Sequence, residues 1–331
     1  MREDQAEVCI CRLAAACTLS RRRVEARCSC PFARLQTRSG RLPCRYSLLI
    51  WRLPIMTTAR LDGLDPITSP SQLRDFFDRA CKGDAVLGIG TEHEKFGFDR
   101  ETLEPLAYDG PRGIRATLDA LAEQFGWTPV FEDGHPIALH RHAAAITLEP
   151  GGQLELSGRV TRTIHETRDE LHEHLAELAM VSDALGQYWA HLSMNPWDDL
   201  DGVPWMPKGR YRIMRRYLPT KGALAHWMMK MTCTVQTNLD FRTEQDALDL
   251  LRLTTVLSPL VTALFAHSPY RFGKENGSES FRMRIWEETD PDRCGIPDFF
   301  LQSASFDDYV EYLLDVPMFL IERDGEYVDY A

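Results

Sequence analysis

The chain lacks the short glycine-rich signatures that mark the commonest nucleotide-binding sites. Its 331 residues contain no P-loop, no Rossmann glycine pattern, no Gly-x-Ser-x-Gly turn and no internal repeat. No Ser-His-Asp or Cys-His arrangement occurs at a recognisable spacing, which argues against covalent catalysis. No uninterrupted apolar run approaches about 18 residues, so the sequence predicts no membrane span.

Basic residues are outnumbered by acidic ones. The chain has 38 Lys and Arg against 49 Asp and Glu, and its net charge of −11 argues against a nucleic-acid partner. With 44% hydrophobic and 26% charged residues, its composition is typical of a globular protein with a sizeable core. We therefore expect one large domain or two smaller ones.

Residues 1–55 differ from the rest, because they hold eleven arginines and six of the nine cysteines. A zinc module fits poorly, since Cys9/Cys11 and Cys28/Cys30 are separated by a single residue. A secretory signal would need an apolar segment, which is absent. An organelle transit peptide fits the arginines but not the cysteines. We favour a disordered head or upstream sequence translated from a misassigned start, with the protein beginning at Met56.

Cysteine is sparse after this head. Only Cys81, Cys233 and Cys294 follow. This is expected of a reducing compartment, so we expect a cytoplasmic protein.

Two acidic segments carry most of the chemical information: residues 90–98 (GTEHEKFGF) and 148–158 (LEPGGQLELSG). On a strand, Glu92 and Glu94 project from one face, and so do Glu149 and Glu155 if the Pro-Gly-Gly step keeps the register. Four carboxylates on one side would repel each other unless divalent cations bridge them. Such hard oxygen ligands suit Mg²⁺ or Mn²⁺ shared with substrate phosphates.

A solvated strand face is the alternative interpretation, because surface strands often carry glutamate. Three features favour a site. Glycines cluster around the carboxylates, His93 and Lys95 have the opposite parity, and a third polar strand follows at residues 232–241. That strand places polar side chains on one face: Thr232, Thr234, Gln236, Asn238 and Asp240.

The remaining pattern predicts an α+β fold around a largely antiparallel sheet. The periodicity predicts strands at 85–98 and 136–157, and three solvated histidines on the helix at 162–185 (His165, His172 and His174). Basic and aromatic residues concentrate at 206–217. This pattern fits a surface helix and an anion-binding wall equally well. Helices are expected at 69–83, 113–125, 162–185, 243–267 (interrupted by Pro259) and 307–314, with a strand, a turn at 324–325 and a second strand at the end.

These residues alone favour a Mg²⁺-dependent enzyme that uses ATP, or an acid-bridged metal-binding protein. From about residue 56 onward, the chain also resembles glutamate–cysteine ligase of the plant and proteobacterial type. The resemblance rests on five motifs in order: 90–98 (GTEHEKFGF), 148–158 (LEPGGQLELSG), 206–211 (MPKGRY), 232–241 (TCTVQTNLDF) and 314–318 (LDVPM).

This resemblance implies a glutamine-synthetase-like fold, in which a curved antiparallel sheet with flanking helices forms an active-site funnel. It implies that ATP phosphorylates the γ-carboxylate of L-glutamate and that the amine of L-cysteine then displaces phosphate, the first step of glutathione synthesis. It implies Mg²⁺ or Mn²⁺ ligands at Glu92, Glu94, Glu149, Glu155 and Gln236. Arg282, Arg210, Lys208, Arg293, Gln236 and Asn238 are the expected substrate or nucleotide contacts, with Arg282 and Arg210 catalytic.

The chain departs from the family in one respect. The family continues beyond the end of this sequence with a Glu-x-Arg motif that supplies a metal ligand and a phosphate-stabilising arginine. We therefore expect residues 56–331 to be the first two-thirds of a catalytic domain, and the chain to be unstable or inactive if it is the whole product. An ATP-dependent glutamate–amine ligase of another pathway and a non-catalytic metal- or glutamate-binding remnant remain the alternatives.

Overall fold

The computed structural model describes residues 67–196, 199–302, 304–323 and 325–330. The predictions for the head at 1–55 and for Asp324 in the final turn lie outside these residues. The chain divides into two compact units that interleave along the sequence. Unit 1 contains Gly88–Asn238 and Leu260–Asp290, and unit 2 contains the described residues up to Leu87, Leu239–Pro259 and those from Pro291 onward.

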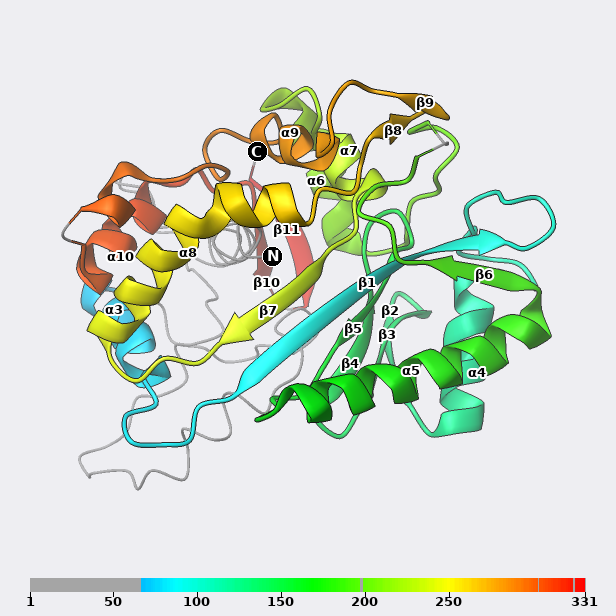
Figure 1. Cartoon of the computed structure of the whole chain (residues 1–331), viewed down its shortest axis with the longest axis horizontal. Coiled ribbons are helices and arrows are strands. Elements are labelled where there is room, and N and C mark those ends of the chain that lie inside the picture. The colour runs from blue at the N-terminus through cyan, green and yellow to red at the C-terminus, as the bar shows by residue number, and fades with distance from the viewer. Residues whose placement is uncertain (1–66, 197–198, 303, 324, 331) are drawn as a thin grey trace. The chain divides into compact units, whose positions relative to one another are not determined.

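Unit 1 is built on a seven-stranded sheet in which β1 is central. The strand order is β2-β3-β4-β5-β1-β6, and β7 also pairs with β1. β1 is long enough to pair with β5 through Glu92–Lys95 and with β6 through Phe96–Asp99, both antiparallel. Figure 1 shows β7 beside β1, running in the opposite direction. The strands are β1 (Ile89–Asp99), β2 (Thr128–Glu132), β3 (His135–Arg141), β4 (Ala144–Leu148), β5 (Leu154–Ser157), β6 (Gln187–Ala190) and β7 (Val235–Leu239).

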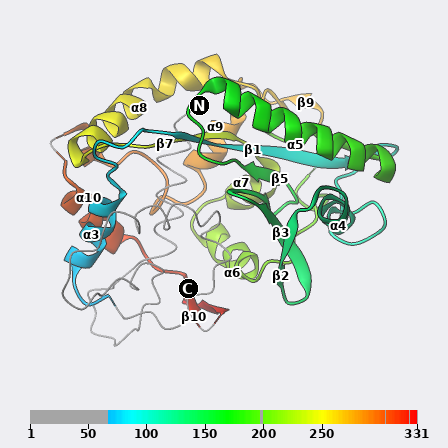
Figure 2. The same ribbon diagram turned by 90° about the horizontal axis from the view of Figure 1, so that it is seen from below.

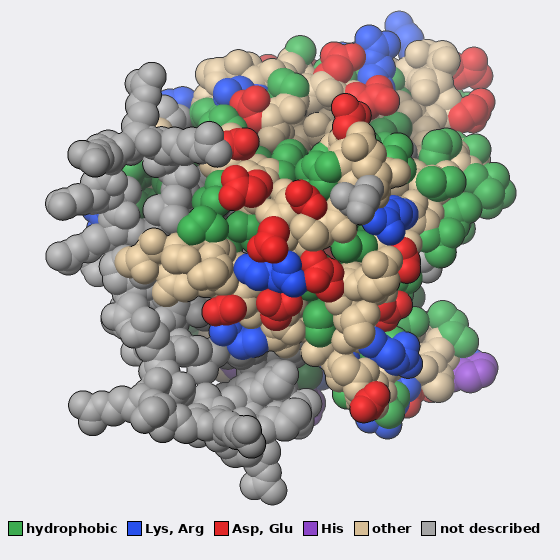
Figure 3. Space-filling view, turned by 90° about the vertical axis from the view of Figure 1, so that its left-hand side faces the viewer, with side chains coloured by type: hydrophobic (Ala, Val, Ile, Leu, Met, Phe, Trp, Pro, Cys, Tyr) green, Lys and Arg blue, Asp and Glu red, His purple; other side chains and the backbone are tan. Residues whose placement is uncertain are grey.

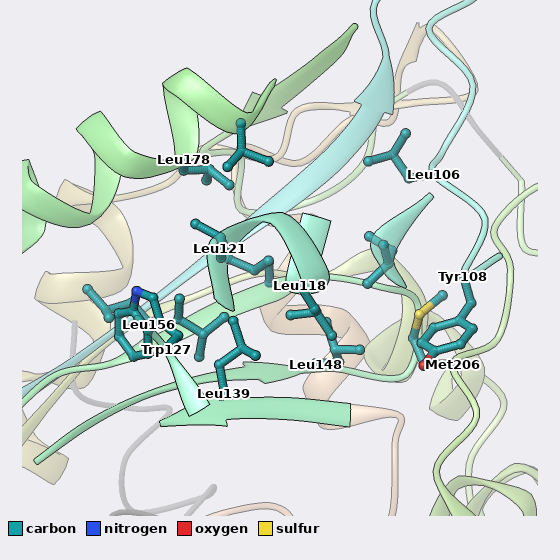
Figure 4. Packing of buried hydrophobic residues seen from close by; sticks show 14 of the residues in the cluster. Leu106, Tyr108, Leu118, Leu121, Trp127, Leu139, Leu148, Leu156, Leu178 and Met206 are labelled. Carbon is teal, nitrogen blue, oxygen red and sulfur yellow. The ribbon is translucent and has the colours of Figure 1, made fainter. Parts of the chain in front are cut away.

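Helices α4 (Ile114–Phe125) and α5 (Ile164–Leu185) form the main core with one face of this sheet. α4 ends at Gly126, which adopts the left-handed conformation with φ of 72°. α5 begins with a capping box between Thr163 and Glu166. Figure 2 shows α5 extending along the sheet. Figure 4 shows side chains of both helices and of the strands meeting, among them Leu118, Leu121, Leu178, Leu139 and Leu148.

The predicted α+β class with a largely antiparallel sheet is confirmed, and the leucines between the acidic residues do point into the core. Leu148, Leu154 and Leu156 are at most 2% exposed. Not every apolar side chain of α5 joins this core, because Ile164 and Met180 are 76% and 60% exposed.

A second cluster in unit 1 packs α7 (Ala225–Met231) against α9 (Phe281–Glu287) through Trp227, Met231, Phe281 and Ile285. The sequence predicted neither helix. Residues 199–208 contain no helix or strand and lead into α6 (Gly209–Tyr217), which is followed by a short 3₁₀ turn, Leu218–Thr220. β8 (Tyr270–Arg271) and β9 (Lys274–Glu275) form a small hairpin.

Unit 2 joins helices from three parts of the chain. It contains α3 (Pro70–Ala80), most of α8 (Glu244–Leu264), the 3₁₀ turn Asp298–Leu301, α10 (Phe306–Asp315) and the hairpin of β10 (Leu320–Arg323) and β11 (Glu326–Asp329). Arg74 on α3 forms ion pairs with Asp78, Glu244 and Asp307 at 3.1, 2.7 and 3.0 Å. Figure 3, which views the side of α3 and α10, shows acidic and basic side chains intermixed there.

Helix α8 is long and apolar enough, by length and composition alone, to cross a membrane. Its most apolar 18-residue window has a mean hydropathy of 1.4, and 17% of that window is buried. Leu253, Val256 and Leu264 are 51%, 67% and 69% exposed. One such helix is weak support for a span, so the absence of a membrane partner stays a prediction.

Candidate active site

The two acidic segments lie on neighbouring strands, and their carboxylates face the same side of the sheet. Glu94 on β1 and Glu155 on β5 are direct cross-strand partners, and Glu92 lies opposite Ser157. Glu94 is 8% exposed and Glu155 is 1% exposed. One carboxylate oxygen of Glu155 accepts a 2.6 Å hydrogen bond from the Ser157 hydroxyl. The solvated-face interpretation is therefore wrong for these two residues.

Glu149 joins this face through the turn between β4 and β5. Thr147 is the cross-strand partner of Glu155, and the Glu149 amide donates to the Gln153 carbonyl at 2.9 Å. The ladder thus continues through the Pro-Gly-Gly step without a change of register, so Glu149 shares the parity of Thr147. The Pro-Gly-Gly step therefore keeps the register, which was the condition for Glu149 and Glu155 to share one face.

The third polar strand is held against the first two glutamates. The Thr234 amide donates to a Glu94 carboxylate oxygen at 3.1 Å, and the Asn238 side-chain amide donates to Glu92 at 3.0 Å. Gln236, the predicted further ligand, is 3% exposed. Cys233, just before β7, is buried, whereas Val235 at the start of β7 is 42% exposed.

Arg282 lies at the beginning of α9 and is fixed beside this strand. Its backbone amide donates to the Ser268 hydroxyl at 3.0 Å, and its Nε donates to the Cys233 carbonyl at 3.1 Å. Burial raises the pKa of the Cys233 thiol well above its usual range. The charges of Glu94 and Glu149 add to this rise, and those of Lys95 and Arg282 oppose it.

The basic residues of the segment at 206–217 lie in two different environments. Arg212, Arg215 and Arg216 are exposed on α6, and Arg215 packs over the Trp205 ring at 4.8 Å, as in an ordinary surface helix. The two basic residues before them differ. Lys208 is 5% exposed and donates to the Leu148 carbonyl at 2.8 Å, while Arg210 lies 5.1 Å from the centre of the Tyr211 ring.

Arg293, another predicted anion contact, belongs to unit 2. There it is 2% exposed, packs over the Phe319 ring at 4.6 Å and donates to the Pro317 carbonyl. Within the described residues, no three His, Cys, Asp or Glu side chains converge closely enough to hold one metal ion. The structure therefore gathers four glutamates on one sheet face but not as a closed coordination sphere.

Basic side chains are buried on the opposite side of these strands. The sequence predicted the parity of the two strand residues but not the burial of the histidine from α5. His93, Lys95 and His174 are 9%, 0% and 2% exposed, so the prediction of a solvated His174 is wrong, whereas His165 and His172 are exposed as expected. Burial lowers the pKa of Lys95 to about 8 and that of His93 to about 4. His174 lies three residues after Leu171 and four before Leu178, about one helical turn from each. This spacing puts it on the buried apolar stripe of α5.

Comparison with known proteins identifies the relatives of this site. The family model for glutamate-cysteine ligase family 2 (GCS2) matches residues 88–331. The chloroplastic glutamate–cysteine ligase B of Oryza sativa subsp. japonica is 44% identical over 266 residues, which cover 80% of this chain and 53% of the relative. The chloroplastic enzymes of Brassica juncea and Arabidopsis thaliana are 44% and 43% identical, and the match covers 80% of this chain and 51% and 50% of theirs.

The chain thus spans about half the length of the curated relatives that it matches. These relatives are chloroplastic, which overturns the cytoplasmic location expected from the sparse cysteines. The family resemblance found in the five motifs is confirmed, because the matched region contains all of them. The chain belongs to glutamate-cysteine ligase family 2.

Proposed function

We propose that this chain joins the γ-carboxylate of L-glutamate to the amino group of L-cysteine with consumption of ATP. Family membership supports this activity, and so do the names of the relatives. The observation that carries the proposal is the cross-strand pair Glu94 and Glu155, buried on the face that also bears Glu92 and Glu149. Glutathione synthesis would begin with this reaction.

The donor set fits a hard divalent cation, Mg²⁺ or Mn²⁺, because every proposed ligand offers an oxygen atom. Because no three of the described acidic side chains converge on one point, Glu92, Glu94, Glu149, Glu155 and the side-chain carbonyl of Gln236 would share such cations with the ATP phosphates. A bound cation would neutralise charge on these carboxylates and on the ATP phosphates during phosphoryl transfer. Two buried carboxylates on adjacent strands repel each other, and an opposing charge on this face would relieve that cost.

The basic and amide groups would orient the substrates. Arg282, next to the polar strand, would bind a carboxylate of glutamate and the developing γ-phosphate, and Arg210 would bind a second anionic group. Asn238 would contact a substrate beside Glu92. In the first step the γ-carboxylate of glutamate takes the terminal phosphoryl group of ATP and ADP leaves. In the second step the cysteine nitrogen forms a C–N bond as the C–O bond to phosphate breaks, phosphate leaves, and the nitrogen gives up a proton to solvent. Arg293 stays a proposed anion contact, and the sheet face is proposed as one wall of a glutamine-synthetase-like funnel.

The direct test is ADP release by the purified chain. ADP release that requires L-glutamate, L-cysteine and Mg²⁺ together and yields γ-glutamylcysteine would support the activity and refute the expectation that the chain by itself is inactive. A screen of other amines in place of cysteine separates this enzyme from a related glutamate–amine ligase. Calorimetric binding of glutamate or Mn²⁺ without ADP release would instead identify a non-catalytic binding protein. No ADP release and no binding of nucleotide or metal would refute the proposal.

Glu155→Gln sharpens this test, because it removes one charge with almost no change of shape. We expect ADP formation to fall by at least about 100-fold, the typical loss when one charge-stabilising group is removed. Thermal stability should be retained or rise, since a buried carboxylate beside Glu94 is costly without a cation. Glu123→Gln, at an exposed position on α4, is the matched control and should leave both quantities unchanged.

A further inference from the structure

We propose that Lys208 and Tyr211 are positioning residues that set the orientation of Glu149 by holding the backbone carbonyl of Leu148. This inference rests on the proposed function, because it assigns Glu149 a role in cation binding. It gives Lys208 a different task from the substrate contact expected from the sequence. The two residues flank the beginning of α6, far from Glu149 in sequence.

The Leu148 carbonyl receives two buried donors. Lys208 Nζ donates to it at 2.8 Å and the Tyr211 hydroxyl donates at 2.6 Å. Leu148 itself is fully buried, and Lys208 and Tyr211 are 5% and 2% exposed. Two donors on one carbonyl fix the direction of that peptide plane. The next residue along the chain is Glu149, so the same plane sets where its side chain begins.

The rest of the turn is fixed by independent contacts. The Met206 amide donates to the Pro150 carbonyl at 2.9 Å, so the segment before Lys208 also contacts the turn. Gln153 accepts from the Gly151 amide at 2.9 Å and donates to the Thr232 carbonyl at 2.8 Å. The turn bearing Glu149 is therefore restrained on one side by residues 206–211 and on the other by the start of the polar strand.

The surroundings of Lys208 are those of a structural ammonium group among carboxylates. Burial and the charge of Arg210 lower its pKa to about 7, against the opposing charges of Glu149, Glu155 and Glu132. The Gly209 amide also donates to Glu132, which anchors the beginning of α6. Because Lys208 bonds to the backbone behind Glu149, its side chain acts on the site through that backbone. A misplacement of about 1 Å at a reacting group can reduce a rate by about 100-fold.

Tyr211→Phe tests the proposal with Mn²⁺ as the probe, and Tyr108→Phe is its matched control. Tyr108 lies in the same core cluster, is 6% exposed, and its hydroxyl donates to the Pro136 carbonyl at 2.9 Å. Both variants lose one tyrosine–carbonyl hydrogen bond, but only Tyr211 acts next to a proposed ligand. We expect Tyr211→Phe to weaken Mn²⁺ binding by about 10-fold or more, as loss of a ligand-orienting partner does, and Tyr108→Phe to leave it within about twofold.

Lys208→Met provides a second test, in which the direction of the change in Mn²⁺ affinity is informative. Removing a positive charge close to Glu149 would by itself strengthen cation binding, so weaker Mn²⁺ binding can come only from lost positioning. Calorimetry measures the affinities, and thermal unfolding compares the loss of stability in all three variants. Equal affinities in Tyr211→Phe and Tyr108→Phe, or tighter binding in Lys208→Met, would overturn the inference alone. Absence of Mn²⁺ binding by the unaltered chain would overturn the proposed function and this inference with it.

Discussion

His174, His93 and Lys95 show how burial decides protonation at single residues. They lie on the α5 side of the sheet, opposite the glutamates. Burial lowers the pKa of His174 well below its usual range, and the charges of Lys95, His93, His191 and Arg141 lower it further. Both ring nitrogens of His174 are buried and accept or donate no hydrogen bond within the described residues. A neutral imidazole is therefore the folded form, held at a cost of about 1–3 kcal/mol.

This environment predicts a stability that falls with acid. Above the unfolded pKa of about 6.5, His174 is neutral in both states, and the stability is fully present. Below it the unfolded chain binds a proton that the folded chain does not, so the free energy of unfolding drops by up to about 1.4 kcal/mol per pH unit. His174→Leu should raise stability at neutral pH and reduce this slope below pH 6.5, as measured by urea unfolding.

His165→Leu is the control, because His165 is exposed on the same helix. It should leave the slope unchanged. A slope in His174→Leu equal to that of the unaltered chain would show that His174 is protonated in the folded state.

The elements that the sequence predicted are those with local signals. Capped helices such as α3 and α5, and the parity of Glu92 and Glu94 along β1, depend on neighbours within a few residues. Strand β6 was missed because its identity comes from pairing with β1. The targets of Lys208 and Gln153 lie 60 and 79 residues away in sequence, and no spacing rule places such contacts.

The glycines of the two acidic segments differ in how much space their surroundings leave for a side chain. A Cβ added to Gly151 would lie 2.7 Å from the Lys230 carbonyl oxygen. A Cβ added to Gly90 would have Asn238 as its nearest neighbour, at 3.6 Å. The sequence argument that glycine allows a close backbone approach thus holds for the β4–β5 turn and not for the start of β1.

Gly151→Ala and Gly90→Ala test this difference. Backbone atoms of α7 cannot yield as a flexible side chain would, so Gly151→Ala should lower the free energy of unfolding by about 1–3 kcal/mol. It should also weaken Mn²⁺ binding, because the turn carries Glu149. Gly90→Ala should be neutral or slightly stabilising through the unfolded chain. Chemical denaturation measures both, and equal losses in the two variants would contradict the distinction.

At the scale of the whole molecule, the chain forms two units, each built from interleaved segments of the sequence. Unit 2 joins α3 to α8 and α10, although Arg74 on α3 and its partner Glu244 on α8 are 170 residues apart in sequence. The ion pairs of Arg74 are partly buried, with 22% exposure for the Arg74 side chain and 30% for Glu244. Glu244 also accepts from the Phe306 amide at 2.6 Å, which continues the network to the start of α10.

Removing the centre of this network should therefore loosen unit 2 selectively. Arg74→Leu leaves Asp78, Glu244 and Asp307 without their shared cation, and we expect a loss of about 1–3 kcal/mol. Hydrogen exchange should accelerate at amides of α3 and α10, while those of β1, β4 and β5 keep their protection, because unit 1 has its own core. Arg284→Leu removes a largely exposed pair with Glu288 on α9 and should change neither set by more than a few tenths of a kcal/mol. Uniform acceleration across both units in Arg74→Leu would mean that the two unfold as one cooperative body.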